Sequence, residues 1–487
     1  MSVTLSAKTI GRGAFWSIIN QSAAQILVLL VFLVTARFVS KEAFGIMAVC
    51  LLVVEGFRQV AIEGVAASVI SRKDADDKLF NATFVIIVSS GIACAAVVFL
   101  LAEPVSVWLN NPDIAPALRW TSLLLVTVGL SKTHEAWLAK QLMFKTLAIR
   151  SLISITIGGS IGIWMAVNDY GVISLIAQQL ITSLVGAASL WVTTRWRPSL
   201  RVEGTQIKSV LNHSRHVSLS AFASFASMQS DVFFASYYLG ANQTGVFSAA
   251  KRISMAMWLM ISSSLNAVAL PIQAALRDDK ARSAEAYLKC VFISAAFTAP
   301  IYIGVAALSP EIVQLLLGPK WADVAPVLSL MALSFSVTAL SQYNSNIFLV
   351  SNKAHWQTGI TVVNGIANFV LFFYMARYGL LALTGAFLVK TILFAPLSIL
   401  PALRLLQIRW TAFVMAILAP VVSSLIMGAL LYLATSQLPT WPSNLRLVVM
   451  IVVGAAVYIG LMLVLNRAGV LDIFGLLRQM LRKEKAQ

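Results

Sequence analysis

Residues 82–102 read ATFVIIVSSGIACAAVVFLLA, a run of apolar and small residues without a charged side chain. An α-helix rises 1.5 Å per residue, so about twenty such residues cross the roughly 30 Å hydrocarbon core of a bilayer. The whole chain has this character, because 59% of its 487 residues are hydrophobic, 11% are charged and the mean hydropathy is +0.85. No soluble core could bury so much apolar surface. The sequence therefore predicts an all-α integral membrane protein.

Similar apolar runs recur along the chain, separated by breaks that contain charges, Gly, Pro or Asn. They predict about fourteen transmembrane helices, near residues 14–38, 44–70, 82–102, 117–138, 147–167, 171–193, 217–239, 245–270, 287–308, 325–350, 358–376, 380–402, 412–434 and 447–466. The first run follows Lys8 and Arg12, as in a secretory signal, but it is too long and lacks a small-residue cleavage site. We expect it to be retained as the first span.

Basic residues at the ends of the spans predict the orientation, because cytoplasmic loops are enriched in Lys and Arg. The formal charge of +17 arises from 36 Lys and Arg against 19 Asp and Glu. With the N-terminus inside, most of the 36 fall on the cytoplasmic side, many of them in the loop 195–215 and the tail 467–487. The opposite side receives Arg37, Lys41, Arg119, Lys320, Arg377 and Arg446. Both termini are expected in the cytoplasm, as an even number of spans requires.

The basic loop 195–215 divides the chain into two halves that repeat each other. The matching segments are PVSVWLNNPDIAP at 104–116 and PEIVQLLLGPKWADVAP at 310–326, then 169–171 and 377–379, and 44–45 and 244–245. Because six is an even number, two six-helix copies insert in the same orientation, as parallel repeats around a central cavity. The predicted organisation is a six-helix lobe at 1–200, a second at 201–410, two additional helices at 411–466 and a basic cytoplasmic tail at 467–487.

Charged side chains inside the predicted spans are the sharpest functional signal. At the bilayer centre each costs at least about 2.5–3.5 kcal/mol unless it has a partner, a cavity or a route to the surface. Glu55 and Arg58 lie three residues apart, as do Lys132 and Glu135, so each pair could neutralise itself on one helix face. The other candidates in the spans are Glu63, His134, Asp231, Lys251, Arg252 and Lys390.

Lys251 and Arg252 are adjacent, and no acid lies three or four positions away in their span. They need a partner from elsewhere. Asp231, in the preceding span, is the candidate within the protein, and an anionic substrate headgroup in the cavity is the functional candidate. A third interpretation is that both side chains snorkel to the outer surface nearby.

Amide and phenol side chains are also frequent in the spans, and two interpretations stay open. Their hydrogen-bonding groups suit sugar hydroxyls, but helices in membrane bundles also use such groups to bond to one another. The residues are Asn20, Gln21, Gln25, Gln342, Tyr343, Asn344, Asn346, Asn364 and Asn368.

Patterns typical of enzymes and metal sites were not found. The four histidines are scattered, no phosphate-binding loop occurs, and Gly11-Arg12-Gly13 follows no strand. Cys50, Cys94 and Cys290 lie in apolar runs without metal-ligand spacing. We expect no disulfide, metal or cofactor, and no nucleic-acid partner. A membrane-embedded glycosyltransferase or polymerase would need catalytic carboxylates on a large loop, and every predicted loop is short.

Several motifs resemble the polysaccharide exporters of the Wzx/WzxC type, which belong to the multidrug/oligosaccharidyl-lipid/polysaccharide exporter (MOP) superfamily. The run from Asp231 to Trp321 is the most specific part, and the resemblance extends over essentially the whole chain. Ala235, where a glycine is usual, and Lys140-Gln141, where an arginine is usual, depart from the family pattern. The motifs are Trp16-Ser17 with Gln21, SRKD at 71–74, Leu239-Gly240, GVFSAAKRI at 245–253, Leu270-Pro271 and LGPKW at 317–321.

The resemblance implies a MATE-like fold and an alternating-access flippase in the bacterial inner membrane. Its substrate would be an undecaprenyl-diphosphate-linked repeat unit of an exopolysaccharide or lipopolysaccharide, with a polysaccharide polymerase and export machinery as further partners. A cation-coupled multidrug exporter of the same superfamily is the alternative. The residues expected to bind substrate are Lys251, Arg252, Asp231, Lys132, Gln25, Asn344 and Lys390, and those expected to couple transport to protons are Asp231, Glu55 and Glu63.

Overall fold

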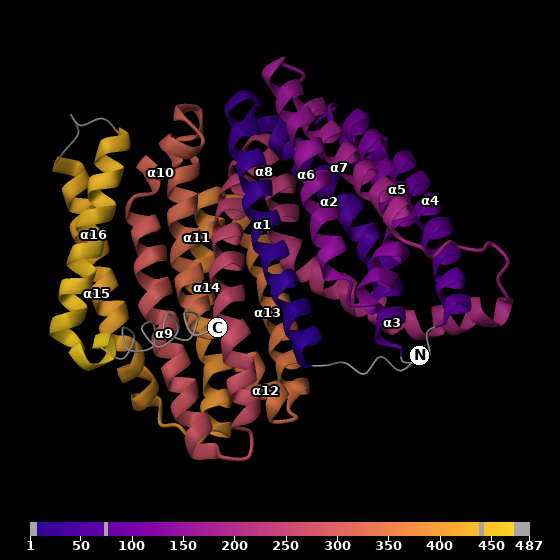
Figure 1. The fold of residues 1–487 in the computed structure, drawn as a ribbon. Coiled ribbons are helices and arrows are strands. Elements are labelled where there is room, and N and C mark those ends of the chain that lie inside the picture. Colours follow the sequence, from indigo (N-terminus) through magenta and orange to yellow (C-terminus); the bar gives the residue numbers. More distant parts are fainter. Residues whose placement is uncertain (1–6, 73–75, 438–442, 472–487) are drawn as a thin grey trace. The chain divides into compact units, whose positions relative to one another are not determined.

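The computed structural model of the chain describes residues 7–72, 76–437 and 443–471. Every regular element in these ranges is a helix, which confirms the all-α fold (Figure 1). Within them, eleven helical segments are long and apolar enough to cross a membrane. The count of fourteen is not confirmed. The spans expected at 217–239 and 245–270 are two helices that share the label α8 (Gly204–Ala275) and meet at Gly240, whose backbone is not helical (φ 76°, ψ 177°).

Some expectations fall outside the described residues. The predicted basic tail lies there beyond residue 471, as does Lys73, and so do the side chains of Asn20 and Gln21.

The chain forms two compact units. The first comprises Met1–Arg252 with Gly365–Leu380, and the second comprises Ile253–Asn364 with Leu381–Gln487. The predicted lobes at 1–200 and 201–410 stay a prediction.

The first unit is a bundle in which α4 packs on α5, α6 on α7, and α1 on α6. Ser40 begins α2 by accepting a hydrogen bond from the Ala43 amide at 3.2 Å, and Asp76 begins α4 by accepting one from Leu79 at 2.9 Å. Besides the first part of α8, the helices are α1 (Ala7–Phe38), α2 (Lys41–Arg58), η1 (Gln59–Glu63), α3 (Gly64–Ser71), α4 (Asp77–Trp108), α5 (Ile114–Lys140), α6 (Phe144–Val167) and α7 (Val172–Thr193).

Gly45 and Gly245, which the sequence pairs as equivalent, meet where α2 crosses α8. A Cβ atom added at Gly45 would lie 1.8 Å from the Ala241 carbonyl oxygen, and one added at Gly245 would lie 1.9 Å from that of Lys41. Only glycine allows two backbones to approach so closely. The two contacts are reciprocal, because Gly45 meets Ala241 while Gly245 meets Lys41, four residues before Gly45. A two-fold relation between two copies requires such reciprocal contacts.

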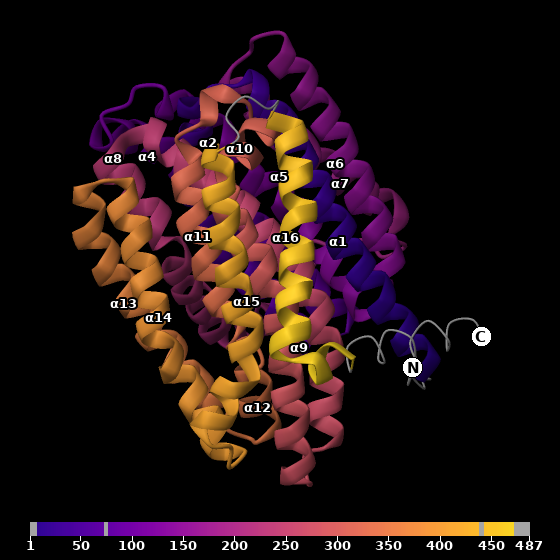
Figure 2. The ribbon, with the colours of Figure 1, turned by 90° about the vertical axis from the view of Figure 1, so that its left-hand side faces the viewer.

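The second unit is built around α9, which packs against α11 and α15, while α15 lies beside α16 (Figure 2). Its core gathers Tyr287, Tyr343, Phe348 and Phe413. The helices are α9 (Lys280–Ala307), α10 (Ser309–Leu316), η2 (Pro319–Trp321), α11 (Val324–Ala339), α12 (Asn344–Val350), α15 (Trp410–Gln437) and α16 (Ser443–Leu465), with most of α14 (Leu380–Leu405) and the first part of α13 (Ala354–Met375).

The span expected at 325–350 is not one continuous helix. It breaks after Ala339 and resumes at Asn344. The break coincides with the polar run SQYNSN at 341–346, which interrupts the apolar span expected there.

Replacing Gly245 with Ala tests the close crossing of α2 and α8. The added methyl group collides with a backbone carbonyl that cannot rotate away, so we expect destabilisation of about 1–3 kcal/mol, as for other overpacked sites. Thermal unfolding of the purified protein in detergent measures it. Gly460→Ala is the matched control, because no atom lies within 4 Å of its added Cβ and helix propensity favours Ala by about 1 kcal/mol. Equal melting temperatures for Gly245→Ala and the wild type would contradict the crossing.

Candidate functional site

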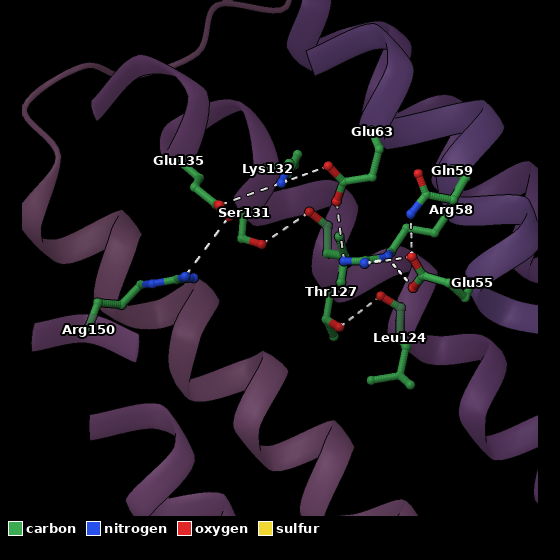
Figure 3. A network of polar contacts seen from close by, with 11 residues as sticks. Glu55, Arg58, Gln59, Glu63, Leu124, Thr127, Ser131, Lys132, Glu135 and Arg150 are labelled. Atoms are coloured by element: carbon green, nitrogen blue, oxygen red, sulfur yellow. Dashed lines mark hydrogen bonds and ion pairs between the residues drawn. The ribbon is translucent and has the colours of Figure 1, made fainter. Parts of the chain in front are cut away.

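Six charged side chains of the first unit form one connected chain, which we name the acid–base network (Figure 3). Three acids alternate with three bases along it. The order is Glu55, Arg58, Glu63, Lys132, Glu135 and Arg150.

A π-helical turn places the central acid of the network. In an α-helix, residues five apart point about 140° away from each other, so Arg58 and Glu63 would face different directions. Between them η1 forms a π turn, in which the Gly64 amide donates to the Gln59 carbonyl five residues back. The wider turn brings Glu63 round to Arg58. Such turns inside α-helices are frequent at functional sites.

The distances show how the ion pairs of the network are connected. Arg58 donates from Nε and Nη2 to the two carboxylate oxygens of Glu55 at 2.7 and 2.8 Å. Its Nη1 lies 3.2 Å from Glu63, whose other oxygen lies 2.9 Å from the Lys132 Nζ. Lys132 also reaches Glu135 at 3.5 Å. Glu63 is therefore shared between two cations and joins the α2–η1 segment to α5.

The network balances its own charge. Three carboxylates face three cations, and the six side chains are between 16% and 33% exposed. In a largely apolar surrounding, removing one member would leave a neighbour uncompensated. The expected pairs Glu55–Arg58 and Lys132–Glu135 are both present, and Glu63 connects them.

Lys251 lies in a second charged site of the first unit. Its ammonium group donates to Asp231 Oδ1 and to Gln229 Oε1, both at 2.8 Å, and to the Met228 carbonyl at 3.1 Å. These three bonds use all three of its N–H donors. The structure thus places Lys251 against Asp231, the partner proposed within the protein.

Arg252 does not join Asp231, contrary to the expectation that the two adjacent cations share it. Its guanidinium lies over the Phe32 ring, 4.9 Å from the centroid, because it points about 100° away from Lys251 around α8. It lines a small cavity of about 40 Å³ with Gln178, Gln179 and Ser248. Within the part of the chain that the structure describes, Arg252 forms no ion pair.

The remaining predicted site residues are separate from these groups. Gln25 is half-buried on α1, without a described hydrogen bond. In the second unit, Asn344 is buried, accepts from Tyr287 at 2.7 Å and donates to Ser398 at 2.6 Å, so it joins helices. Lys390 lies near the Phe387 and Phe394 rings, at 5.7 and 5.6 Å.

Sequence reasoning missed three participants. Arg150 was not among the candidates named in the spans, but its Nη2 lies 3.9 Å from Glu135. Gln59 donates to Glu55, and Gln229 accepts from Lys251. The position of Arg150 inside an apolar run was the signal available for it. Among the described residues, no group of three His, Cys, Asp or Glu side chains could hold a metal ion.

The fold is one that known membrane transporters share. The lipid II flippase MurJ matches with a TM-score of 0.74 at 16% sequence identity, over 92% of this chain and 98% of that one. A multidrug resistance MATE family transporter of the MOP superfamily matches with a TM-score of 0.52 at 14% identity, over 84% and 97% of the two chains. The chain therefore has the fold shared by these transporters, as predicted.

Sequence comparison identifies the family. The model of the polysaccharide biosynthesis protein family matches residues 33–326. The succinoglycan biosynthesis transport protein ExoT of Rhizobium meliloti is 26% identical over 79% of this chain and 75% of its own length. The lipopolysaccharide biosynthesis protein WzxC of Escherichia coli is 24% identical over 68% of this chain and 67% of its own length. The chain belongs to the polysaccharide biosynthesis protein family and is a multi-pass membrane protein, which confirms the resemblance to WzxC-type proteins.

A double-mutant cycle on Glu63 and Lys132 tests the network. We expect Glu63→Gln and Lys132→Met each to lower the free energy of unfolding. The double variant should lose less stability than the two single losses added together, with a coupling energy of about 0.5–3 kcal/mol. Equilibrium unfolding in mixed detergent micelles measures it. The exposed pair Arg119–Glu103, at 2.9 Å and 42% and 63% exposed, is the control and should couple by less than about 1 kcal/mol. Additive effects for Glu63 and Lys132 would refute the shared contact.

Proposed function

We propose that the chain moves a lipid-linked oligosaccharide repeat unit from the cytoplasmic to the periplasmic leaflet by alternating access. Its membership of the polysaccharide biosynthesis protein family carries the proposal, because the matched residues 33–326 include both charged sites. ExoT and WzxC are named for succinoglycan and lipopolysaccharide biosynthesis, and MurJ for flipping lipid II. The substrate we propose is an undecaprenyl-diphosphate-linked repeat unit. ExoT is named as a transport protein and MurJ as a flippase, so the role that we propose is that of a transporter and not an enzyme.

Physics supports the outward direction of transport. Moving one negative charge outward across an inside-negative potential is favoured by about 2.3 kcal/mol per 100 mV. A diphosphate can therefore be driven outward by the membrane potential. In a proton-coupled variant of this mechanism, Asp231, Glu55 and Glu63 are the carboxylates we propose to carry the proton.

Among the proposed substrate residues, Arg252 is best suited to an anionic headgroup. Its neighbour Lys251 already contacts Asp231, Gln229 and Met228. Arg252 has no acid within ion-pair distance among the described residues, and a cation in an apolar surrounding needs a counter-charge. Lys132, Gln25, Asn344 and Lys390 stay proposed contacts of lower rank, since Lys132 and Asn344 already have protein partners.

The proposed location is the bacterial inner membrane with both termini in the cytoplasm, as the distribution of Lys and Arg favours. A polysaccharide polymerase and export machinery are the proposed further partners. The alternative of a cation-coupled multidrug exporter is less supported, because the family match and the relatives named above concern polysaccharides.

Lipid analysis of a deletion strain tests the function. We expect a lipid-linked oligosaccharide to accumulate in the cytoplasmic leaflet and exported polysaccharide to be lost, with both restored by the wild-type gene. Drug tolerance serves as the control and should not change. Normal polysaccharide together with altered drug tolerance would overturn the proposal in favour of a drug exporter.

Substitution of Arg252 in the complementing gene tests its role. Arg252→Gln removes the charge, and we expect export to fall at least tenfold, whereas Arg252→Lys should retain a measurable part. Arg119→Gln, a change at an exposed arginine, is the control and should export normally. Membrane levels of each variant are measured by immunoblot. Full export by Arg252→Gln at the wild-type protein level would exclude a role of Arg252 in substrate binding.

A further inference from the structure

The first unit contains a large apolar cavity apart from the acid–base network. Its volume is about 740 Å³, and its walls come from α2, η1, α4, the first part of α8 and the end of α13. Four aromatic rings, from Phe57, Phe225, Phe233 and Phe369, line it. The volume lies within the range of about 300–1,000 Å³ that is typical of sites for organic ligands.

Small residues make the space. Gly56, Ala61 and Ala226 stand among the aromatic rings on three of the walls. A Cβ atom added at Gly56 would lie 3.3 Å from the Phe225 ring, so the glycine lets that ring approach α2. An apolar lining gains dispersion contacts from an apolar ligand. A hydrocarbon chain is therefore the kind of ligand that suits this lining.

The cavity has a polar end. Gln229 lines it, and the same side chain accepts a hydrogen bond from Lys251 at 2.8 Å. Its amide nitrogen has no hydrogen-bond partner among the described residues and can still donate. Lys251 is itself paired with Asp231 at 2.8 Å, and Arg252 points away to Phe32. The site is therefore apolar along its length, with the Gln229 amide as a hydrogen-bond donor at one end.

We propose that this cavity holds the polyprenyl chain of the lipid-linked substrate during transport, with the diphosphate end directed towards Gln229. The inference rests on the proposed function and adds a binding site for the lipid part of the substrate. The walls from α2, η1, α4 and α13 belong to three segments able to span a membrane, Lys41–Ser71, Asp77–Trp108 and Ala354–Tyr378, so the cavity lies among membrane-spanning helices. A single cavity with a single polar end fits a lipid with one chain, whereas a phospholipid has two.

Photo-crosslinking tests the site in the full-length protein, reconstituted in lipid nanodiscs. The probe is undecaprenyl diphosphate with a diazirine on its polyprenyl chain, and mass spectrometry maps the labelled residues. We expect labels on the cavity walls, around Cys94 and Phe225, that unlabelled undecaprenyl diphosphate abolishes. The same excess of phosphatidylglycerol should leave them unchanged. Labels spread over lipid-facing surfaces, or equal competition by phosphatidylglycerol, would overturn the proposal.

A matched pair of variants sharpens the test. Ala226→Phe fills the cavity and should reduce labelling at least fivefold. Ala223→Phe makes the same change on the same helix at an exposed position outside the lining and should label like the wild type. Ala61→Leu, a smaller change on another wall, replaces Ala226→Phe if that variant does not fold. If Ala226→Phe is labelled as strongly as the wild type, the cavity is not the binding site of the polyprenyl chain.

The two proposals fail in distinguishable ways. A deletion strain that accumulates lipid-linked oligosaccharide, together with cavity variants that label and export normally, refutes the cavity and leaves the flippase intact. A deletion strain without that accumulation refutes the flippase itself, whatever the probe labels.

Discussion

Charge inside hydrocarbon must be balanced within the protein, and Glu63 is where this chain meets that constraint. Its two oxygens serve Arg58 at 3.2 Å and Lys132 at 2.9 Å. These contacts connect the α2–η1 segment to α5, and Glu135 and Arg150 extend the connection to α6. Charged side chains in membrane-spanning helices must face the interior of the bundle and pair with one another. The π turn contributes to this pairing, because it positions Glu63 between its two cations.

The sequence predicted features that follow from composition and spacing. The run 82–102 lies within α4, and the i,i+3 spacing predicted the pairs Glu55–Arg58 and Lys132–Glu135. The contact of Lys251 with Asp231 followed from the absence of a nearer acid. Hydropathy could not predict the π turn at 59–63, because the turn does not change the apolar pattern. The break after Ala339 does have a signal, the polar run SQYNSN at 341–346, which was included in one span.

Other features depend on packing between segments that are distant in the sequence. Arg252 was expected beside Asp231, but its direction around α8 takes it to Phe32. The amide of Asn344 was a candidate for binding sugars, but it bonds to Tyr287 and Ser398 in the core of the second unit. The apolar cavity was not predicted, because Gly56, Ala61 and Ala226 define a space only once their helices pack together.

Direct observation of lipid movement tests the central claim, that this fold flips a lipid-linked saccharide. The purified protein is reconstituted in vesicles with a fluorescent polyprenyl-diphosphate saccharide, and a membrane-impermeant reductant quenches the outer leaflet. The account predicts that the protected inner pool becomes accessible at least tenfold faster with the protein than in protein-free vesicles, and faster still when the potential drives anions outward. Equal rates with and without the protein, at any potential, would contradict it.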